Sequence, residues 1–165
     1  MVTLYKSNKF NLMASKRNTP SFDYLKYWRV IRYYVKAKYG LTQGDLDILL
    51  FLYSEQYFGK DKFDEFNTLL SWDKNRFNKL LRDDWISCFR KYNQKTKEKS
   101  LYQVSYKGKR VIGAIYKKLN GEEIPVSQSN NSMFAKNVSY TDARYREFIK
   151  EMNAYLKQQR HPSPE

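Results

Sequence analysis

The sequence predicts a mainly α-helical fold with one small β-hairpin, and three observations lead to this prediction. Apolar residues recur at spacings of three and four through most of the 165 residues, as in helices with one buried face. Two short runs, 85–89 and 101–104, are instead rich in aromatic and β-branched residues, which is typical of strands. The stretch between these runs is polar and rich in lysine, as expected for a hairpin tip.

The N-terminal region predicts a basic arm followed by a helix. Residues 1–18 hold four basic side chains without helical periodicity, which favours a flexible arm. Thr19 and Pro20 match the N-cap and first position of a helix, and Gly40 can supply the left-handed residue that ends it. We therefore expect the first helix over residues 20–39.

The next segment predicts a central helix and then a short one. Thr42 and Asp45 have the spacing of a capping box, with aspartate in place of the usual glutamate. Apolar residues cover most of the helix that follows, so we expect it at the centre of the core, with Gly59 ending the segment. Phe63 is predicted to form a one-residue strand bridge, and Asp64 to cap a short helix.

A turn then leads to a helix with a single apolar stripe. Asp73 is the expected N-cap, and Trp72 is placed to pack on Phe77 as a hydrophobic staple. The helix is expected to end at Asp83-Asp84. Its inward-facing residues are predicted to be Phe77, Leu80 and Leu81.

Two more helices are predicted after the hairpin. Ser105 is placed to cap a helix that runs to about Leu119, and residues 122–138 have the proline, serine and asparagine content of a linker. A final amphipathic helix runs to about Gln158. The predicted organisation is a basic arm (1–18), a helical domain with the hairpin (19–121), the linker (122–138) and a docking or dimerisation helix with its tail (139–165).

The positive charge is concentrated in two segments. The chain has 31 Lys and Arg residues against 17 Asp and Glu, a formal net charge of +14. Residues 1–38 have a net charge of +8 and residues 90–120 of +9, whereas residues 39–89 have −3 and residues 121–165 have zero. Such segregation favours a basic face that binds a polyanion over the plainer interpretation of a charged, solvated surface.

The rare residues argue against an enzyme. The only histidine, His161, lies in a proline-rich stretch near the end of the sequence. The only cysteine, Cys88, lies on a predicted strand, and we expect it in the core. One His and one Cys exclude zinc sites of the finger or deaminase type. The sequence also lacks the phosphate-binding motifs G-x-x-x-x-G-K-S/T and G-x-G-x-x-G. Helix capping and termination explain the acidic groups at 61–65 and 83–84. We expect no catalytic activity, no metal and no cofactor.

No apolar run approaches the length of a membrane span, and no signal-peptide pattern begins the chain. The expected location is therefore the cytoplasm, of a bacterium or of a phage-infected host cell, with no membrane partner.

The predicted order of elements matches the plan of a winged helix-turn-helix domain with extra N- and C-terminal helices. In that plan the second helix of the turn enters the major groove of DNA, and the hairpin, or wing, reaches the adjacent backbone. The face opposite Phe77 supplies the candidate base contacts: Asn75, Arg76, Asn78, Lys79 and Arg82. The wing supplies the candidate backbone contacts: Arg90, Lys91, Lys95, Lys97 and Lys99.

Three stretches also carry a resemblance to a known family. Leu41-Thr42 with residues 45–49 is similar to a helix start of the form LT…F.VL, and residues 66–77 to a segment of the form LA..LGVDRSTV. Residues 104–110 are similar to LTEKG at the start of the helix after the wing. In this order they resemble the MarR family of winged-helix regulators, over about residues 21–119.

The resemblance implies a sequence-specific transcription regulator that binds double-stranded DNA. It also implies a homodimer formed through the first and last helices, residues 20–39 and 140–158. Members of that family often bind small phenolic ligands between the dimer helices and the DNA-binding part. The sequence leaves open whether this chain has a small-molecule effector.

Two other interpretations stay open. The basic arm and the composition rich in Lys, Tyr and Asn also fit a phage virion or nucleoid structural protein that acts in assembly. A replication initiator or single-strand binder is the other, because Tyr92, Tyr102 and Tyr106 near the basic hairpin are placed to stack on unpaired bases. The plainer interpretation is that these tyrosines pack the hairpin against its domain.

Overall fold

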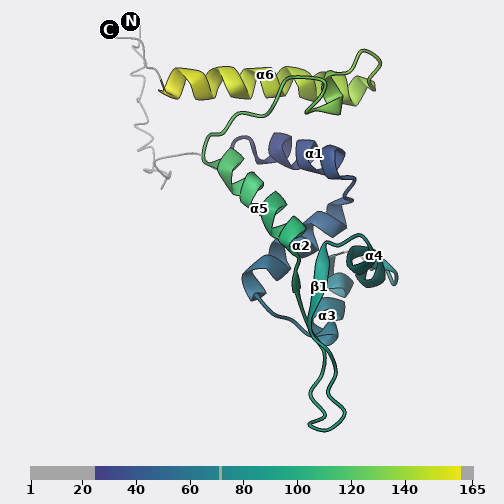
Figure 1. The fold of residues 1–165 in the computed structure, drawn as a ribbon. Helices are drawn as coiled ribbons and strands as arrows, with labels where there is room; N and C mark the ends of the chain where they lie inside the picture. The colour runs from purple at the N-terminus through teal and green to yellow at the C-terminus, as the bar shows by residue number, and fades with distance from the viewer. Residues whose placement is uncertain (1–24, 71, 161–165) are drawn as a thin grey trace, which may run out of the picture.

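The computed structural model describes residues 25–70 and 72–160 (Figure 1). Within these ranges the chain is mainly helical with one two-stranded antiparallel sheet, which confirms the predicted class at that level. The elements are α1 (Trp28–Tyr39), α2 (Gln43–Glu55), α3 (Lys60–Leu70), α4 (Arg76–Arg82), β1 (Ile86–Arg90), β2 (Leu101–Val104), α5 (Tyr106–Leu119), the 3₁₀ turn η1 (Ser132–Phe134) and α6 (Tyr140–Arg160).

The molecule is elongated, with its helices distributed between two ends (Figure 1). α6 and α1 lie side by side at one end, and α2, α3 and α4 gather around the base of the hairpin at the other. α5 runs from the hairpin back to α1 and joins the two ends. The tip of the hairpin extends away from all the helices.

The first helix is shorter than predicted. The arm (1–18) and the start at Thr19-Pro20 lie outside the described residues, but residues 25–27 form a turn and α1 begins only at Trp28. Tyr27 and Trp28 pack against the core at the start of the helix, and Val30 is the first buried residue of α1. Gly40 ends the helix as predicted, with φ of 64° and its N–H donating to the carbonyl of Lys36.

α2 is the central helix that the sequence predicts. Thr42 and Asp45 form the capping box, in which the Thr42 hydroxyl accepts from the Asp45 N–H at 3.1 Å and the Asp45 carboxylate from the Thr42 N–H at 3.1 Å. Four large apolar side chains are fully or almost fully buried: Leu46, Ile48, Leu49 and Leu52. α2 contacts α3, α5 and β2, so it fixes where the other elements lie.

The predictions for Phe63 and Asp64 are wrong. Phe63 is a fully buried residue inside α3, which already begins at Lys60, and Asp64 lies in the middle of that helix. The one-residue bridge is made by Phe58, whose N–H and carbonyl pair with Tyr102 at 3.0 and 2.9 Å. Gly59 separates the bridge from the helix, so the extended residue comes before the glycine and not after it.

α4 also begins later than predicted. Asp73 is not the N-cap; its carboxylate accepts from the N–H of Asn75 at 2.9 Å, and the helix starts at Arg76. Trp72 is 57% exposed, so it does not form the buried staple. Phe77 and Leu80 are buried as predicted, but Leu81 is exposed because the short helix turns it away from the core.

The hairpin has a bulge in its first strand. Ile86 pairs with Val104 and Cys88 with Tyr102, but the register shifts before Arg90, which leaves Phe89 without a paired residue. Cys88 is exposed and not in the core, which corrects the prediction. Only the first residues of the strand are covered, because the hairpin soon extends beyond the helices.

Residues 122–138 are packed against α6 and do not form a free linker. Asn153 of α6 accepts from the N–H of Ile124 at 3.0 Å and donates to its carbonyl at 2.8 Å. Arg146 donates to the carbonyl of Met133 at 3.0 and 2.8 Å. Ile124 and Met133 are buried, so two apolar residues hold a segment whose composition is that of a loop.

Candidate nucleic-acid interface

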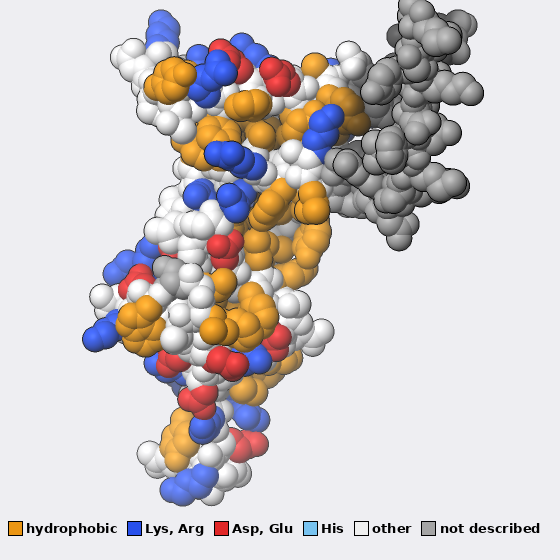
Figure 2. Space-filling model, turned by 180° about the vertical axis from the view of Figure 1, so that it is seen from behind, with side chains coloured by type: hydrophobic (Ala, Val, Ile, Leu, Met, Phe, Trp, Pro, Cys, Tyr) orange, Lys and Arg blue, Asp and Glu red, His pale blue; other side chains and the backbone are white. Residues whose placement is uncertain are grey.

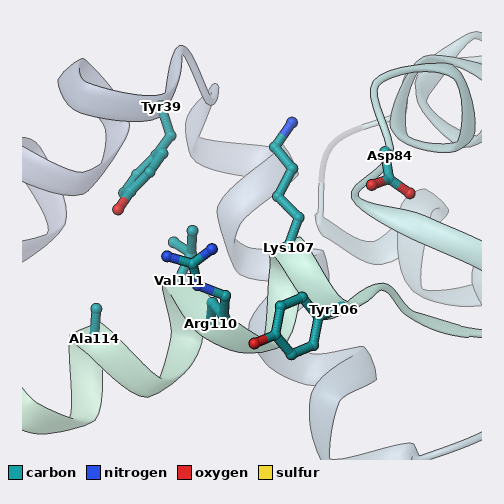
Figure 3. Close-up of a pocket in the computed structure, with 7 residues that line it drawn as sticks. All are labelled: Tyr39, Asp84, Tyr106, Lys107, Arg110, Val111 and Ala114. Atoms are coloured by element: carbon teal, nitrogen blue, oxygen red, sulfur yellow. The ribbon is translucent and has the colours of Figure 1, made fainter.

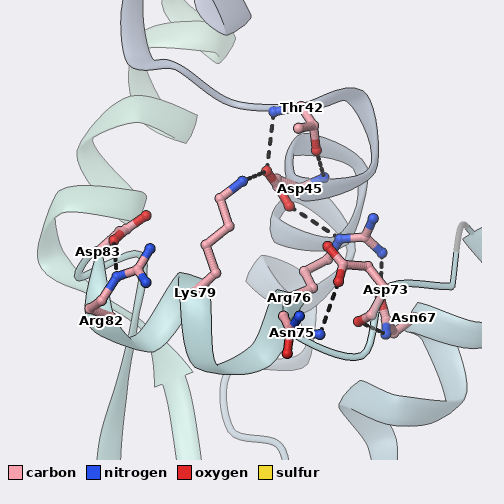
Figure 4. Close-up of polar contacts among 9 residues, drawn as sticks. All are labelled: Thr42, Asp45, Asn67, Asp73, Asn75, Arg76, Lys79, Arg82 and Asp83. Atoms are coloured by element: carbon pink, nitrogen blue, oxygen red, sulfur yellow. Dashed lines mark hydrogen bonds and ion pairs between the residues drawn. The ribbon is translucent and has the colours of Figure 1, made fainter.

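A buried ion-pair network fixes α4 against α2 (Figure 4). The Asp45 carboxylate is almost fully buried, and it accepts from Arg76 Nε at 3.1 Å through Oδ1 and from Lys79 Nζ at 2.7 Å through Oδ2. Both cations belong to α4, one turn apart. One carboxylate therefore sets the position and the rotation of the helix relative to α2.

The same network includes α3 and the turn that follows it. Arg76 Nη1 donates to the side-chain oxygen of Asn67, and Asn67 Nδ2 donates to the Asp73 carbonyl at 2.9 Å. Arg76 is 4% exposed, so it is not on the solvent face of α4 where the sequence analysis placed it. Its role in this fold is to join three helices, because a buried guanidinium has to be paired.

The environment keeps the Asp45 carboxylate charged. Burial by itself would raise the pKa of Asp45, but hydrogen bonds from the Lys79 ammonium and from Thr42 outweigh it and hold the pKa below its usual value. Local sequence patterns assign Asp45 only a capping role, because its partners lie 31 and 34 residues away.

The solvent face of α4 carries three of the five predicted base-contacting residues. Asn75, Asn78 and Arg82 are exposed, while Lys79 is one-third exposed and held by Asp45. Arg82 Nε lies 2.9 Å from a carboxylate oxygen of Asp83, in a pair open to solvent. Carboxamide and guanidinium groups on one helix face are the groups that hydrogen-bond to base edges in a major groove.

The hairpin presents a row of cations beyond the helices. Arg90 pairs with Glu98 at 3.3 Å, and Lys99 with Asp61 at 2.6 Å. The other three predicted backbone contacts are exposed and make no ion pair within the described part of the chain: Lys91, Lys95 and Lys97. Lysine and arginine side chains accordingly reach down to the tip of the hairpin (Figure 2).

The tip that carries these lysines has a defined shape. Asn93 pairs with Glu98 across it, and the Asn93 side chain accepts from the Lys95 N–H at 2.9 Å. Lys97 has a φ of 59°, the left-handed conformation that the tight turn requires.

The first two turns of α5 add cations that the sequence analysis did not single out. Lys107 donates to the Asp83 carbonyl at 2.7 Å and lies 4.2 Å from the centre of the Trp85 ring. With Arg110 it lines a hollow of about 340 Å³, which has Tyr39 on one side and Asp84 on the other (Figure 3). The net charge of +9 over residues 90–120 was the only sequence signal for them.

The tyrosines near the hairpin have different surroundings. Tyr102 packs on Phe77, with ring centroids 5.0 Å apart, so it belongs to the packing between sheet and α4. Tyr92 and Tyr106 are exposed. Of the three residues that the sequence suggested for stacking on bases, Tyr102 is therefore unsuited to that role.

The described part of the chain holds no cluster of His, Cys, Asp and Glu suited to a metal ion. None of its helices combines the length and the apolar character of a membrane span. Comparison of the chain with protein-family models, with curated proteins and with solved structures finds no match. The proposals below are therefore based on the residues and their geometry.

Proposed function

We propose that this chain is a winged helix-turn-helix protein of the MarR type that binds duplex DNA and regulates transcription. One observation carries the proposal. The α3–turn–α4 unit is locked by Asp45, Arg76 and Asn67, and a lysine-rich hairpin follows it directly. A rigid helix beside a basic hairpin is the combination that such domains use to read a groove and hold the backbone.

α4 is the recognition helix in this proposal. Asn78 is placed to form paired hydrogen bonds with an adenine, and Arg82 with a guanine. Asn75 lies at the amino end of the same face. Lys79, whose charge is partly taken up by Asp45, contacts a phosphate or a base at the edge of the groove. Arg76 contributes indirectly, because it holds the helix in place.

The hairpin acts as the wing. Lys91, Lys95 and Lys97 contact phosphates, since their charges are not neutralised by carboxylates in the described structure. Arg90 and Lys99 contribute less, because each has an acidic partner. These contacts supply affinity without sequence information.

The end formed by α1 and α6 supplies the dimer interface. A hollow of about 690 Å³ lies between these helices, lined by Tyr27, Tyr145 and Phe148 among others, and Phe148 is about half exposed. The position of this face, at the opposite end from the hairpin, leaves both recognition helices of a dimer free (Figure 1). They would meet half-sites about one DNA turn, roughly 34 Å, apart.

The decisive test is selection of duplexes from a random pool, read by sequencing. The expected result is enrichment of a two-fold symmetric motif. Asn78→Ala should lose the preference at one position of each half-site, whereas Asn137→Ala, an exposed asparagine near α6, should leave the motif unchanged. Equal recovery of all sequences would overturn the regulator proposal.

One observation favours a second function, in particle assembly. Leu69, Leu70 and Trp72 are all exposed at the turn between α3 and α4, and hydrophobic side chains are visible on that part of the surface (Figure 2). A structural protein of a virion or a nucleoid uses such a patch to bind its neighbours. Presence of the chain in purified particles at a fixed stoichiometry would favour this function over regulation.

A further inference from the structure

The sheet has a second face that the proposed duplex contacts do not use. Tyr102 of β2 packs on Phe77 of α4, so that face is covered by helices. Alternate residues of a strand point to opposite faces, and Gln103 therefore lies on the other face with its cross-strand partner Ser87. α3 and α4 lie on one side of the hairpin and the carboxyl end of α2 on the other (Figure 1).

Two aromatic rings are exposed on this outer face. Tyr57 and Phe89 are 46% and 53% exposed, and their ring centroids lie 4.3 Å apart. Both owe their positions to irregular backbone. The bulge in β1 leaves Phe89 unpaired, and Gln56 before Tyr57 has φ of 58° and ψ of −66°, with the Tyr57 N–H donating to the Glu55 carbonyl at 2.6 Å.

That geometry at Gln56 is a γ-turn of the strained kind, which is rare outside glycine. Strained backbone persists where the surrounding structure requires it, and it is common at ligand sites. Here the strain turns the chain sharply at the end of α2, so that Phe58 enters the core while Tyr57 stays at the surface.

A hollow of about 460 Å³ lies beside these rings, a size within the usual range of small-ligand sites. Its walls combine aromatic rings with hydrogen-bonding side chains: Tyr53, Ser54, Gln56, Tyr57, Gln103 and Lys109. Lys109 donates to the Gln103 side chain at 3.1 Å and has no acidic partner in the described structure, so its charge is available to an anion.

We propose that this surface, made of Tyr53, Tyr57, Phe89, Gln103 and Lys109 and called here the outer sheet surface, binds unpaired nucleotides of a single-stranded nucleic acid. The rings of Tyr57 and Phe89 stack on bases, and the carboxamide of Gln103 hydrogen-bonds to a base edge. Lys109, which lines the hollow, contacts a phosphate. A nucleic-acid strand fits both features of the surface, because its bases can stack on the rings and its phosphates can contact the ammonium group.

The test is fluorescence anisotropy of a labelled oligothymidylate of about twelve nucleotides, at about 0.1 M salt, with the full chain. The double variant Tyr57→Ala/Phe89→Ala should bind about tenfold more weakly or worse. Tyr140→Ala is the matched control, because this exposed tyrosine lies at the start of α6, at the other end of the molecule, and it should bind as the wild type does. Equal affinity of the double variant and the wild type would overturn the proposal, as would a wild type that binds neither this oligonucleotide nor oligouridylate.

Two further arms sharpen the result. Oligouridylate in place of oligothymidylate identifies which strand is preferred, and binding of either one that depends on Tyr57 and Phe89 supports the site. If free thymidine monophosphate binds as tightly as the oligonucleotide, the proposal of a single-stranded ligand is overturned, and the ligand of this surface is a free nucleotide. If the double variant unfolds early in a thermal melt, Lys109→Gln serves instead and should lower the salt dependence of binding by about one phosphate contact.

The proposed single-strand site on the outer sheet surface and the proposed duplex site on α4 can be tested separately. Asn78→Ala/Arg82→Ala should weaken binding to the selected duplex and leave oligothymidylate binding unchanged, whereas Tyr57→Ala/Phe89→Ala should do the reverse. A loss of both activities in both variants would contradict two separate sites.

Discussion

Arg76 Nε lies 3.1 Å from Oδ1 of Asp45, and the two side chains are 5% and 1% exposed although they are 31 residues apart in the chain. The contact joins the helix that forms the centre of the core to the helix proposed to read DNA. Such a pair has to stay intact, because removal of one partner leaves the other as an unpaired buried charge.

Asp45→Asn is therefore expected to destabilise the fold by about 3–5 kcal/mol, which urea unfolding followed by circular dichroism would measure. Asp64→Asn is the matched control. It removes a solvent-exposed ion pair with Lys60 within α3 and should cost no more than about 0.5 kcal/mol. A cost for Asp45→Asn as small as that of the control would contradict the anchoring role.

The same pair predicts how stability responds to acid. The pKa of Asp45 in the folded chain is below the ordinary value of 3.8, so the unfolded chain takes up this proton first as the pH falls. The contribution is complete well above pH 3.8 and is lost as the pH falls through the folded pKa. The difference in unfolding free energy between the wild type and Asp45→Asn should shrink on acidification. If this difference in unfolding free energy stays constant down to strongly acidic pH, the charged Asp45 carboxylate is not what stabilises the fold.

Gly44 gives a steric test of the same network. A Cβ at this position would lie 2.6 Å from Nη2 and 3.0 Å from Cζ of Arg76, whose guanidinium is held by Asp45 and Asn67 and cannot easily move. Gly44→Ala should therefore cost about 1–3 kcal/mol in spite of the better helix propensity of alanine. Gly113→Ala, within α5 and with nothing close to its Cβ, should stabilise by about 0.5–1 kcal/mol. Equal shifts of the two melting temperatures would contradict the clash.

Local patterns in the sequence were sufficient for some of these elements. The capping box of Thr42 and Asp45, the stop at Gly40 and the end of α4 at Asp83 each depend on residues within one or two turns, and the structure has them. The central position of α2 followed from apolar residues on most of its surface, which needs no knowledge of its neighbours.

Other features depended on contacts that are distant in the sequence. Arg76 was placed on the solvent face because the helical period puts it beside Asn75, but Asp45 and Asn67 draw it inside. Phe63 and Cys88 were misplaced for a related reason. The bridge formed at Phe58, on the other side of Gly59, and the bulge with the extension of the hairpin left Cys88 uncovered.

A second titration is predicted where α1 packs on α6. Burial and the hydrogen bond that Tyr33 donates to Asp142 at 2.8 Å raise the pKa of Tyr33 from 10.0 to about 12. Tyr33 also stacks on Tyr145, with ring centroids 3.7 Å apart. Because the folded pKa is the higher one, this contribution to stability is present below pH 10 and is lost as the pH rises towards 12.

Tyr33→Phe should remove that loss while it keeps the stacked rings. The measurement is the unfolding free energy of the wild type and the variant from neutral to alkaline pH, with tyrosinate absorbance to follow ionisation. The variant should be less stable at neutral pH, and its disadvantage should shrink above pH 10. The number of tyrosinates at pH 11 should be nearly the same in folded wild type and folded variant, because Tyr33 is still mostly protonated there. Ionisation of Tyr33 at its ordinary pH would contradict the assigned contacts.

The hairpin lysines should determine how duplex binding responds to salt. Each phosphate contact releases counterions and adds about 0.9 to the slope of the logarithm of affinity against the logarithm of salt concentration. Lys95→Ala/Lys97→Ala should therefore lower the slope by about 1.8, with little change in the preferred sequence. Lys136→Ala/Lys150→Ala removes the same charge from exposed positions at the α6 end and should leave the slope unchanged. Since both double variants have the same net charge, equal slopes for the two would mean that the hairpin does not contact the backbone and that the positive charge acts only at long range.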